Sequence, residues 1–298
     1  MGAEAGERRK VLVLAFSLFN NMEHIISMRP TIGGHVFVCD GLKFDYCFIE
    51  ATLSMLPVCD EVAVLLFDDA DEKELREKIQ DPKLKIIRHR RQDWEDTAPQ
   101  GKYRLSFWTN ETKRHLNTEW QFCLQADEVL HENSYELVRQ AITEPFEAFV
   151  VRRFNLWGDP YHYINYPKIA LRGEAGPCGN HTGRLAKIKY DSWNDAENID
   201  APFTHKYWED IKTYHMGFVR DRKKMVQNKI NMQEKIFQVG KADPKFYKDI
   251  EANAGEFDPY TRFSRDELLP ITEPLPAVIR DWAKARSYGA VDPFDVKP

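Results

Sequence analysis

The sequence predicts an α/β fold built around a mainly parallel central sheet. Apolar runs of strand length alternate with segments of helical spacing between residues 35 and 151, which is typical of strand–helix–strand units. Hydrophobic residues make up 43% of the 298 residues, so the chain can bury a core and is not disordered. Acidic residues follow three of the apolar runs, as expected when a ligand binds at the carboxyl ends of parallel strands.

The expected elements follow from length and spacing. Short apolar runs bounded by polar or turn residues are expected to be strands: 11–16, 35–39, 61–67, 84–87, 120–124 and 148–151. Segments with apolar residues three and four positions apart, or with a charged face, are expected to be helices: 46–56, 72–79, 107–116, 134–142, 218–239 and 278–286. Residues 155–207 are rich in Gly, Pro, Trp, Tyr and Asn and are expected to form functional loops.

Composition limits the classes of protein. The net charge of -5, from 42 Lys+Arg and 47 Asp+Glu, argues against a general nucleic-acid coat. Five widely spaced cysteines without a C-x-x-C pair argue against a disulfide framework or a zinc knuckle and favour free thiols in a reducing compartment. The apolar run at 11–16 is too short to span a bilayer and lacks a cleavage site, so we expect a cytoplasmic protein without a membrane span.

Carboxylates cluster where three expected strands end. Asp40 follows the first, Asp69 and Asp71 follow the second, and Asp127 follows the third. Carboxylates converging on one edge would repel each other unless a cation intervened, and Mg²⁺ or Mn²⁺ carrying a diphosphate would fit there. The alternative is that these acids cap the helices that follow.

Several common catalytic motifs are absent from the sequence. It contains no G-x-x-x-x-G-K-[ST], which argues against a P-loop hydrolase, and no G-x-G-x-x-G, which argues against a nicotinamide-binding unit. It also lacks G-x-S-x-G and H-E-x-x-H, the patterns of serine hydrolases and zinc proteases.

Three sequence blocks, in order over about 190 residues, carry a family resemblance. Residues 38–61 resemble a pattern in which ten positions match: Lys43, Asp45, Tyr46, Glu50, Ser54, Leu56, Pro57, Cys59, Asp60 and Glu61. Residues 120–132 read WQFCLQADEVLHE and resemble W-x-x-x-x-Q-A-D-E-V-x-H-E. Residues 214–220, with the lysines of 223–229, are similar to Y-H-x-G-x-V-R…K. These blocks resemble a branch of glycosyltransferase family 2.

The resemblance implies a Rossmann-like GT-A fold that binds a nucleotide-diphosphate sugar, here expected to be a UDP-sugar, together with Mn²⁺ or Mg²⁺. Residues 1–220 would form the catalytic domain, with the nucleotide-sugar half at about 11–130 and the acceptor half at about 131–220. Residues 221–298 would form a helical C-terminal extension packed on it.

The resemblance also implies roles for individual residues. Asp127 would bind the metal, Gln125 replaces the first acid of the D-x-D motif, and His215 would complete the metal shell unless it is a core or surface histidine. The expected donor-binding residues, including Gln125, are polar side chains near the strand ends and on the helix before the motif: Asp40, Lys43, Asp69, Asp71, Asn110 and Lys113. At Asp71 the family's D-G-T is altered, because Glu72 and Lys73 replace Gly-Thr.

An inverting transfer needs a base that deprotonates the acceptor hydroxyl. Residues 190–198 resemble the family segment that carries this carboxylate. Asp195 is the predicted base, with Asp191 and Glu197 as rivals, and a surface acid without a catalytic role is the alternative for each.

Four hypotheses remain open. The favoured one is transfer to a glycan or other hydroxylated acceptor. The second is transfer to a hydroxylated base in DNA, because residues 83–114 hold nine basic and four acidic residues and residues 212–248 hold ten and three. The third is a nucleotidyltransferase, and the fourth a sugar-binding protein without catalysis.

Overall fold

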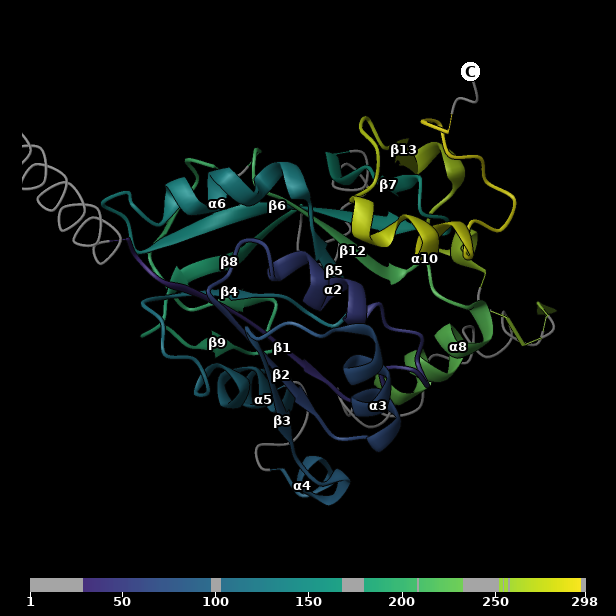
Figure 1. The fold of residues 1–298 in the computed structure, drawn as a ribbon. Helices are drawn as coiled ribbons and strands as arrows, with labels where there is room; N and C mark the ends of the chain where they lie inside the picture. The colour runs from purple at the N-terminus through teal and green to yellow at the C-terminus, as the bar shows by residue number, and fades with distance from the viewer. Residues whose placement is uncertain are drawn as a thin grey trace, which may run out of the picture.

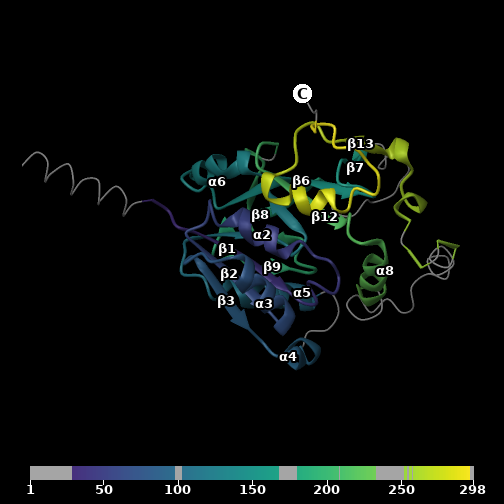
Figure 2. The ribbon, with the colours of Figure 1, turned by 45° about the vertical axis from the view of Figure 1, so that its right-hand side comes forward.

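The computed structural model describes residues 29–97, 103–167, 180–207, 209–232, 252–253, 255–256 and 258–295 (Figures 1 and 2). The strand predicted at 11–16 and the part of the helix predicted beyond residue 232 lie outside these residues. Among the described residues, no helix has the length and apolar character needed to cross a membrane.

A four-stranded parallel unit forms one side of the central sheet. Its order is β3-β2-β1-β4, and every neighbouring pair in it is parallel. The bounds are β1 Ile32–Val38, β2 Glu61–Leu66, β3 Leu84–Arg88 and β4 Trp120–Cys123. The predicted α/β class with a mainly parallel, Rossmann-like sheet is therefore confirmed.

The sheet continues beyond β4 with both strand directions. β8 runs antiparallel to β4 and to β6, while β12 runs parallel to β6 and antiparallel to β5. The bounds are β5 Glu128–Leu130, β6 Ala148–Trp157, β7 His162–Ile164, β8 His181–Lys187, β9 Ser192–Trp193, β10 Asn198–Ile199, β11 Phe203–Thr204 and β12 Lys212–Phe218. The prediction that 155–207 is irregular was wrong at β8, a seven-residue strand.

Helices cover both faces of the parallel unit. Their bounds are α2 Phe48–Met55, α3 Asp69–Lys78, α4 Arg91–Glu95, α5 Tyr103–Lys113 and α6 Tyr135–Ala141. In β2, Val62, Val64 and Leu66 pack in the cluster that holds apolar side chains of α2, α3 and α6. Leu65 packs in the opposite cluster, which holds Trp94 and Trp108. This alternation is the period of two expected for a strand buried on both faces.

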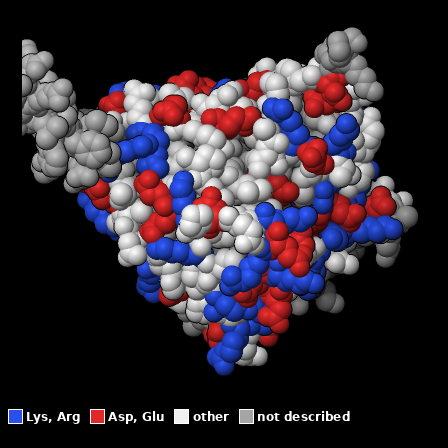
Figure 3. All heavy atoms as spheres, viewed as in Figure 1, with Lys and Arg blue, Asp and Glu red and all other residues white. Residues whose placement is uncertain are grey.

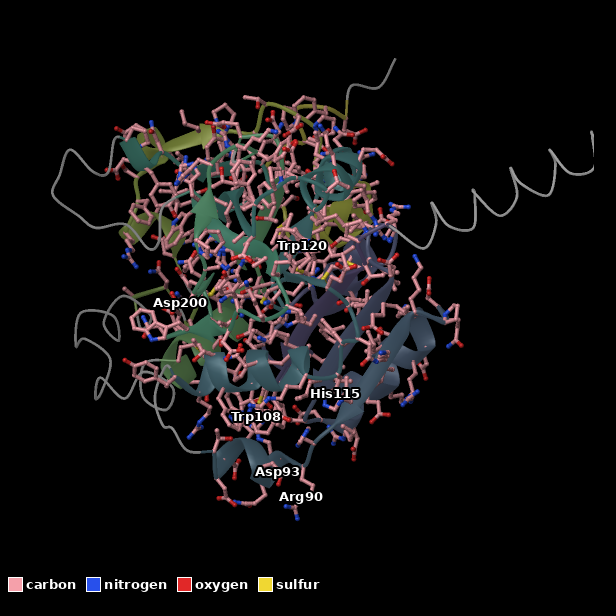
Figure 4. The ribbon with its side chains drawn as sticks, turned by 90° about the vertical axis from the view of Figure 1, so that its left-hand side faces the viewer. Arg90, Asp93, Trp108, His115, Trp120 and Asp200 are labelled. Carbon is pink, nitrogen blue, oxygen red and sulfur yellow. The ribbon has the colours of Figure 1, made fainter. Side chains whose placement is uncertain are left out.

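α5 and the short α4 form the layer that closes the second face. The side chain of Trp108, a residue of α5, lies between α5 and α4 (Figure 4). Its ring meets Phe67 edge to face at 4.7 Å, and its indole N–H donates to Thr97 Oγ1 at 2.8 Å. The N–H group of this buried indole therefore has a hydrogen-bond partner, as expected for a buried tryptophan.

The C-terminal segment packs against the rest of the described chain and adds a strand to the sheet. β13 (Leu268–Pro270) pairs antiparallel with β7, so the predicted helical extension also contributes to the sheet (Figures 1 and 2). The described part of this segment contains the helices α8 Arg222–Asn231 and α10 Arg280–Lys284 and the 3-10 turns Pro259–Thr261, Arg265–Glu267 and Ala277–Ile279. A further 3-10 turn, Glu132–Ser134, precedes α6. The domain boundary at residue 220 stays a prediction.

Candidate active site

A cavity of about 450 Å³ lies at the carboxyl ends of β1 and β4. One end of it is mainly apolar and is lined by Phe37, Trp94, Leu105 and Met232. The other end is polar and is lined by seven charged or titratable side chains: Asp127, Asp195, Glu197, His215, Arg220, Lys229 and Arg262. A cavity with an apolar end and a few converging polar groups is typical of small-molecule sites.

Asp127 lies at the centre of the polar end. The backbone N–H of Met216 donates to the Asp127 carbonyl at 2.7 Å, and β5 pairs His215 opposite Glu128, so β12 brings His215 beside Asp127. His215 Nε2 is 3.6 Å from Asp127 Oδ2. Burial alone would raise the pKa of Asp127, but the charges of His215 and Arg220 outweigh it and hold this pKa well below its usual range.

Gly217 is required by the position of His215. A Cβ at residue 217 would lie 2.5 Å from the imidazole ring and 3.2 Å from Asp127 Oδ2. Any side chain there would displace the histidine from the carboxylate. The Y-H-x-G pattern therefore has a steric cause in this chain.

Arg220 is the partner of Asp127 that the sequence analysis did not assign. Its Nη2 donates to Asp127 Oδ2 at 2.9 Å, its Nη1 donates to the Phe44 carbonyl at 3.3 Å, and its guanidinium lies 4.2 Å from the centre of the Tyr46 ring. It closes the Y-H-x-G-x-V-R block, so the matched sequence block could have indicated it.

The neighbouring carboxylate, Glu128, faces the protein interior. Arg184 Nη2 donates to its Oε1 at 2.6 Å, and Arg153 Nη1 donates to the same oxygen at 3.3 Å. All three side chains are buried. Adjacent residues thus have opposite settings: Asp127 faces the cavity and Glu128 faces a buried ion-pair cluster.

The three base candidates occupy different places. Asp195 and Glu197 line the cavity, whereas Asp191 is exposed and pairs with Lys113. Glu197 Oε2 is 3.7 Å from Arg153 Nη2, and no hydrogen-bond donor reaches this oxygen among the described residues. Burial raises the pKa of Glu197 above its usual value, which suits a base that must accept a proton.

Two expected donor-binding residues hold the loop that carries these acids. Asn110 donates to the Ser192 carbonyl at 2.9 Å and accepts from the Ser192 amide at 2.7 Å. Lys113 donates to the Tyr190 carbonyl at 2.6 Å. Neither side chain is among those that line the cavity. Both lie on α5 and fix residues 190–192 against it.

The expected donor-binding acids after β1 and β2 are divided between the cavity and the structure around it. Asp40 and Gln125 line the cavity, and Arg91 Nη2 donates to Asp40 at 2.8 Å. Asp71 is buried and accepts from the amides of Gly41 and Leu42 at 2.8 and 2.9 Å, so it holds the loop after β1.

Two further candidates lie outside the cavity. Asp69 is exposed and pairs with Arg88 at 2.6 Å. Lys43 is exposed, 3.7 Å from Asp40, and is not among the lining residues. Asp69 and Asp71 lie in the first turn of α3, where acids favour the helix dipole, whereas Asp68 at the N-cap accepts the Asp40 amide and makes no side-chain cap hydrogen bond.

Asp127 and His215 provide two ligands of the types that Mn²⁺ and Mg²⁺ accept. No group of three or more His, Cys, Asp or Glu side chains suited to a metal ion occurs in the described part of the chain. The pair fits a metal only if substrate oxygens and water supply the remaining ligands, as is common for Mg²⁺ bound with phosphates.

Comparisons with known proteins give distant structural similarities. No protein-family model matches the chain, and no curated protein matches it. The structure is similar to 4-diphosphocytidyl-2C-methyl-D-erythritol synthase from Anaerococcus prevotii, with a TM-score of 0.32, 13% identity, and coverage of 76% of this chain and 83% of that chain. It is also similar to a mycobacterial protein, with a TM-score of 0.35, 14% identity, and coverage of 62% and 65%.

Proposed function

We propose that this protein is a glycosyltransferase that moves a sugar from a nucleotide-diphosphate sugar to a hydroxyl group. The observation that carries the proposal is the cavity in which Asp127, His215 and cationic side chains face two carboxylates, Asp195 and Glu197. The three sequence blocks that resemble glycosyltransferase family 2 support the same activity, because the second and third contain Asp127 and His215.

The two ends of the cavity suit the two parts of such a donor. Phe37 and Trp94 offer aromatic surface on which a nucleobase can pack. The polar end offers groups that attract a diphosphate. The volume of about 450 Å³ lies within the usual range for small-molecule sites, roughly 300–1,000 Å³. UDP is the nucleotide that the family resemblance favours.

Glu197 is the base that the geometry favours, with Asp195 as its rival. In an inverting transfer the base takes the acceptor proton while the acceptor oxygen bonds to the anomeric carbon and the diphosphate leaves with the electron pair of the broken bond. Arg153 stabilises the ionised form of Glu197 beside the cavity, so the carboxylate is available before the acceptor binds.

Asp127 and His215 would hold Mn²⁺ or Mg²⁺ in this proposal. When bound, such an ion neutralises charge on the leaving diphosphate. Arg220 keeps Asp127 ionised and oriented, through its contact with Oδ2 at 2.9 Å. His215 keeps its place because Gly217 leaves room for its ring.

A glycan or small hydroxylated acceptor is favoured over DNA by the surface charges. Several cations of residues 83–114 pair with nearby acids: Arg88 with Asp69, Arg90 with Asp93, and Arg114 with Glu111. On the face that Figure 3 shows, Lys and Arg are interleaved with Asp and Glu near the bottom, where α4 lies in Figure 1. A gel shift with duplex DNA at low salt tests the alternative, and salt-sensitive binding would favour it.

The test of the function is thermal stabilisation by a panel of nucleotide sugars and nucleoside triphosphates, with Mn²⁺ or with EDTA, followed by assays of sugar transfer. Stabilisation by one nucleotide sugar together with sugar release supports the proposal. Stabilisation by a triphosphate with pyrophosphate release identifies a nucleotidyltransferase instead, which the cations of the polar end also suit.

Asp127→Asn is the variant that tests the role of Asp127 in the transfer assay. We expect transfer to fall about 10²–10³-fold, because the leaving diphosphate loses electrostatic stabilisation. Asp69→Asn, an exposed acid at the end of β2, is the control and should keep the wild-type rate. Wild-type transfer by Asp127→Asn would remove Asp127 from the mechanism.

A further inference from the structure

Three cations gather at the polar end of the cavity. Arg220, Lys229 and Arg262 all line it, although they come from the end of β12, from α8 and from the segment before β13. Arg220 pairs with Asp127. Among the described residues, no carboxylate lies within ion-pair distance of Lys229 or Arg262. The sequence analysis assigned a role to none of the three.

Lys229 is held in this position by the packing of α8. Met225 and Val226 on the same helix are buried, and Tyr46 donates to Asn228 Oδ1 at 3.1 Å, which ties the helix to the loop after β1. Lys229 Nζ lies 4.1 Å from the centre of the Phe218 ring. The ammonium group therefore faces an aromatic ring and the cavity.

The electrostatic setting of Lys229 suits an anion that is not part of the protein. Burial, together with the charges of Arg220 and Arg262, lowers the pKa of Lys229 to about 7, and the charge of Asp127 opposes this shift. A bound anion would reverse this balance, because it would favour the charged form of the lysine. Neighbouring positive charges such as Lys229 and Arg262, which have no carboxylate partner among the described residues, are typical of phosphate-binding sites.

We propose that Arg220, Lys229 and Arg262 bind the diphosphate group of the donor, so that diphosphate binding does not require a divalent metal. The inference rests on the proposed function only in assigning this diphosphate to a nucleotide sugar. A guanidinium binds phosphate oxygens through paired N–H groups, and a lysine acts as a point charge. Arg220 also donates a hydrogen bond to Asp127, so it connects Lys229 and Arg262 to the proposed metal ligand.

The experiment measures the affinity for inorganic pyrophosphate by calorimetry in excess EDTA, with the full chain. We expect the wild-type protein to bind, and Lys229→Gln and Arg262→Gln each to weaken binding about tenfold, since each removes one charge-assisted contact. Arg262 is exposed, so its variant leaves the core unchanged. Lys223→Gln, an exposed lysine on the same helix that does not line the cavity, is the control and should bind like the wild type.

The outcomes separate this inference from the proposed function. If pyrophosphate binds only when Mn²⁺ is present, or if both variants bind like the wild type, the cation site is wrong even when sugar transfer is observed. If the variants weaken pyrophosphate binding but no nucleotide sugar is bound or turned over, the cation site holds and the glycosyltransferase proposal fails.

Discussion

The acids after β1 and β2 and the acid after β4 have opposite surroundings. After β1, Asp40 is paired with Arg91, and after β2, Asp71 accepts two backbone amides. After β4, Asp127 shares one oxygen between His215 and Arg220, and the cations beyond them lack a carboxylate partner among the described residues. The acids of the first region are paired within the protein, whereas the second region holds two cations, Lys229 and Arg262, that are not ion-paired among the described residues.

This difference in surroundings distinguishes acids with a structural role from acids with a functional role. A buried carboxylate whose oxygens are taken up by backbone amides stabilises a loop and has little capacity for a substrate. A carboxylate at a cavity, next to cations that have no ion-pair partner among the described residues, is a candidate for a functional role. Changes in the first region should therefore alter stability, and changes in the second should alter activity.

Glu197→Gln should give the largest effect, entirely on activity. Transfer should fall about 10²–10⁴-fold, because the acceptor hydroxyl loses its base. Since burial raises the pKa of Glu197, the wild-type rate should fall as the pH drops through that raised pKa, and this limb of the pH profile should be absent in the variant. Steady-state rates across pH measure both effects.

Two related variants control this result. Asp191→Asn should transfer at the wild-type rate, because Asp191 is exposed and outside the cavity. Asp195→Asn decides between the two cavity acids. If it abolishes transfer while Glu197→Gln does not, the base is Asp195, as the sequence analysis predicted.

Asp71→Asn should give the next largest effect, on stability. Both carboxylate oxygens accept backbone amides, and an asparagine offers one acceptor oxygen, so one amide of Gly41 or Leu42 loses its partner. We expect the free energy of unfolding to fall by about 1–3 kcal/mol. Urea denaturation measures it, with Asp69→Asn as the exposed control. A variant as stable as the wild type would show that the loop after β1 does not depend on Asp71.

The smallest effect concerns Asp45 and Arg286. Burial would raise the pKa of Asp45, but hydrogen bonds from Arg286 and from the Asp221 amide outweigh it, so the pKa is lowered. A lowered carboxyl pKa stabilises the fold above the unfolded-state value of about 3.9, and this contribution is lost as the pH falls through the folded-state pKa.

Arg286→Gln tests this contact. At pH 7 it should lower the free energy of unfolding by about 1 kcal/mol or less, because the pair is partly exposed. At pH 2 the difference from the wild type should shrink, since Asp45 is then protonated in both proteins. Urea denaturation at both pH values measures it, and a difference that grows in acid would contradict the assignment.

The strands of the parallel unit could be predicted because each is a continuous apolar run. β8 could not, because its sequence HTGRLAK contains Gly183 and Arg184. A Cβ at Gly183 would lie 2.0 Å from Phe203, and Arg184 is buried because Glu128 pairs with it. Both residues fit a strand only through partners that are distant in the sequence.

Asp127 and His215 were proposed as a pair because both lie in sequence blocks that carry the family resemblance. The structure brings the two together, with Asp127 in the turn after β4 and His215 two residues before Gly217; their role as metal ligands stays a prediction. Lys229 is among the lysines of the third sequence block, but its meeting with Arg262 could not be predicted, because the two belong to separate segments that meet only in the folded chain. Asn110 and Lys113 were found as polar residues near the site, but hydrogen bonding shows that they hold the loop at 190–192.

The pair of Asp45 and Arg286 also bears on how the chain folds during synthesis. The two residues are 241 positions apart, and the same aspartate accepts the amide of Asp221 at the start of α8. Contacts over such separations form late, because the loop they close must first be ordered. On the ribosome, the contact between Asp45 and Arg286 therefore cannot form until Arg286 has emerged, so a shorter nascent chain lacks this link between the C-terminal segment and the loop after β1.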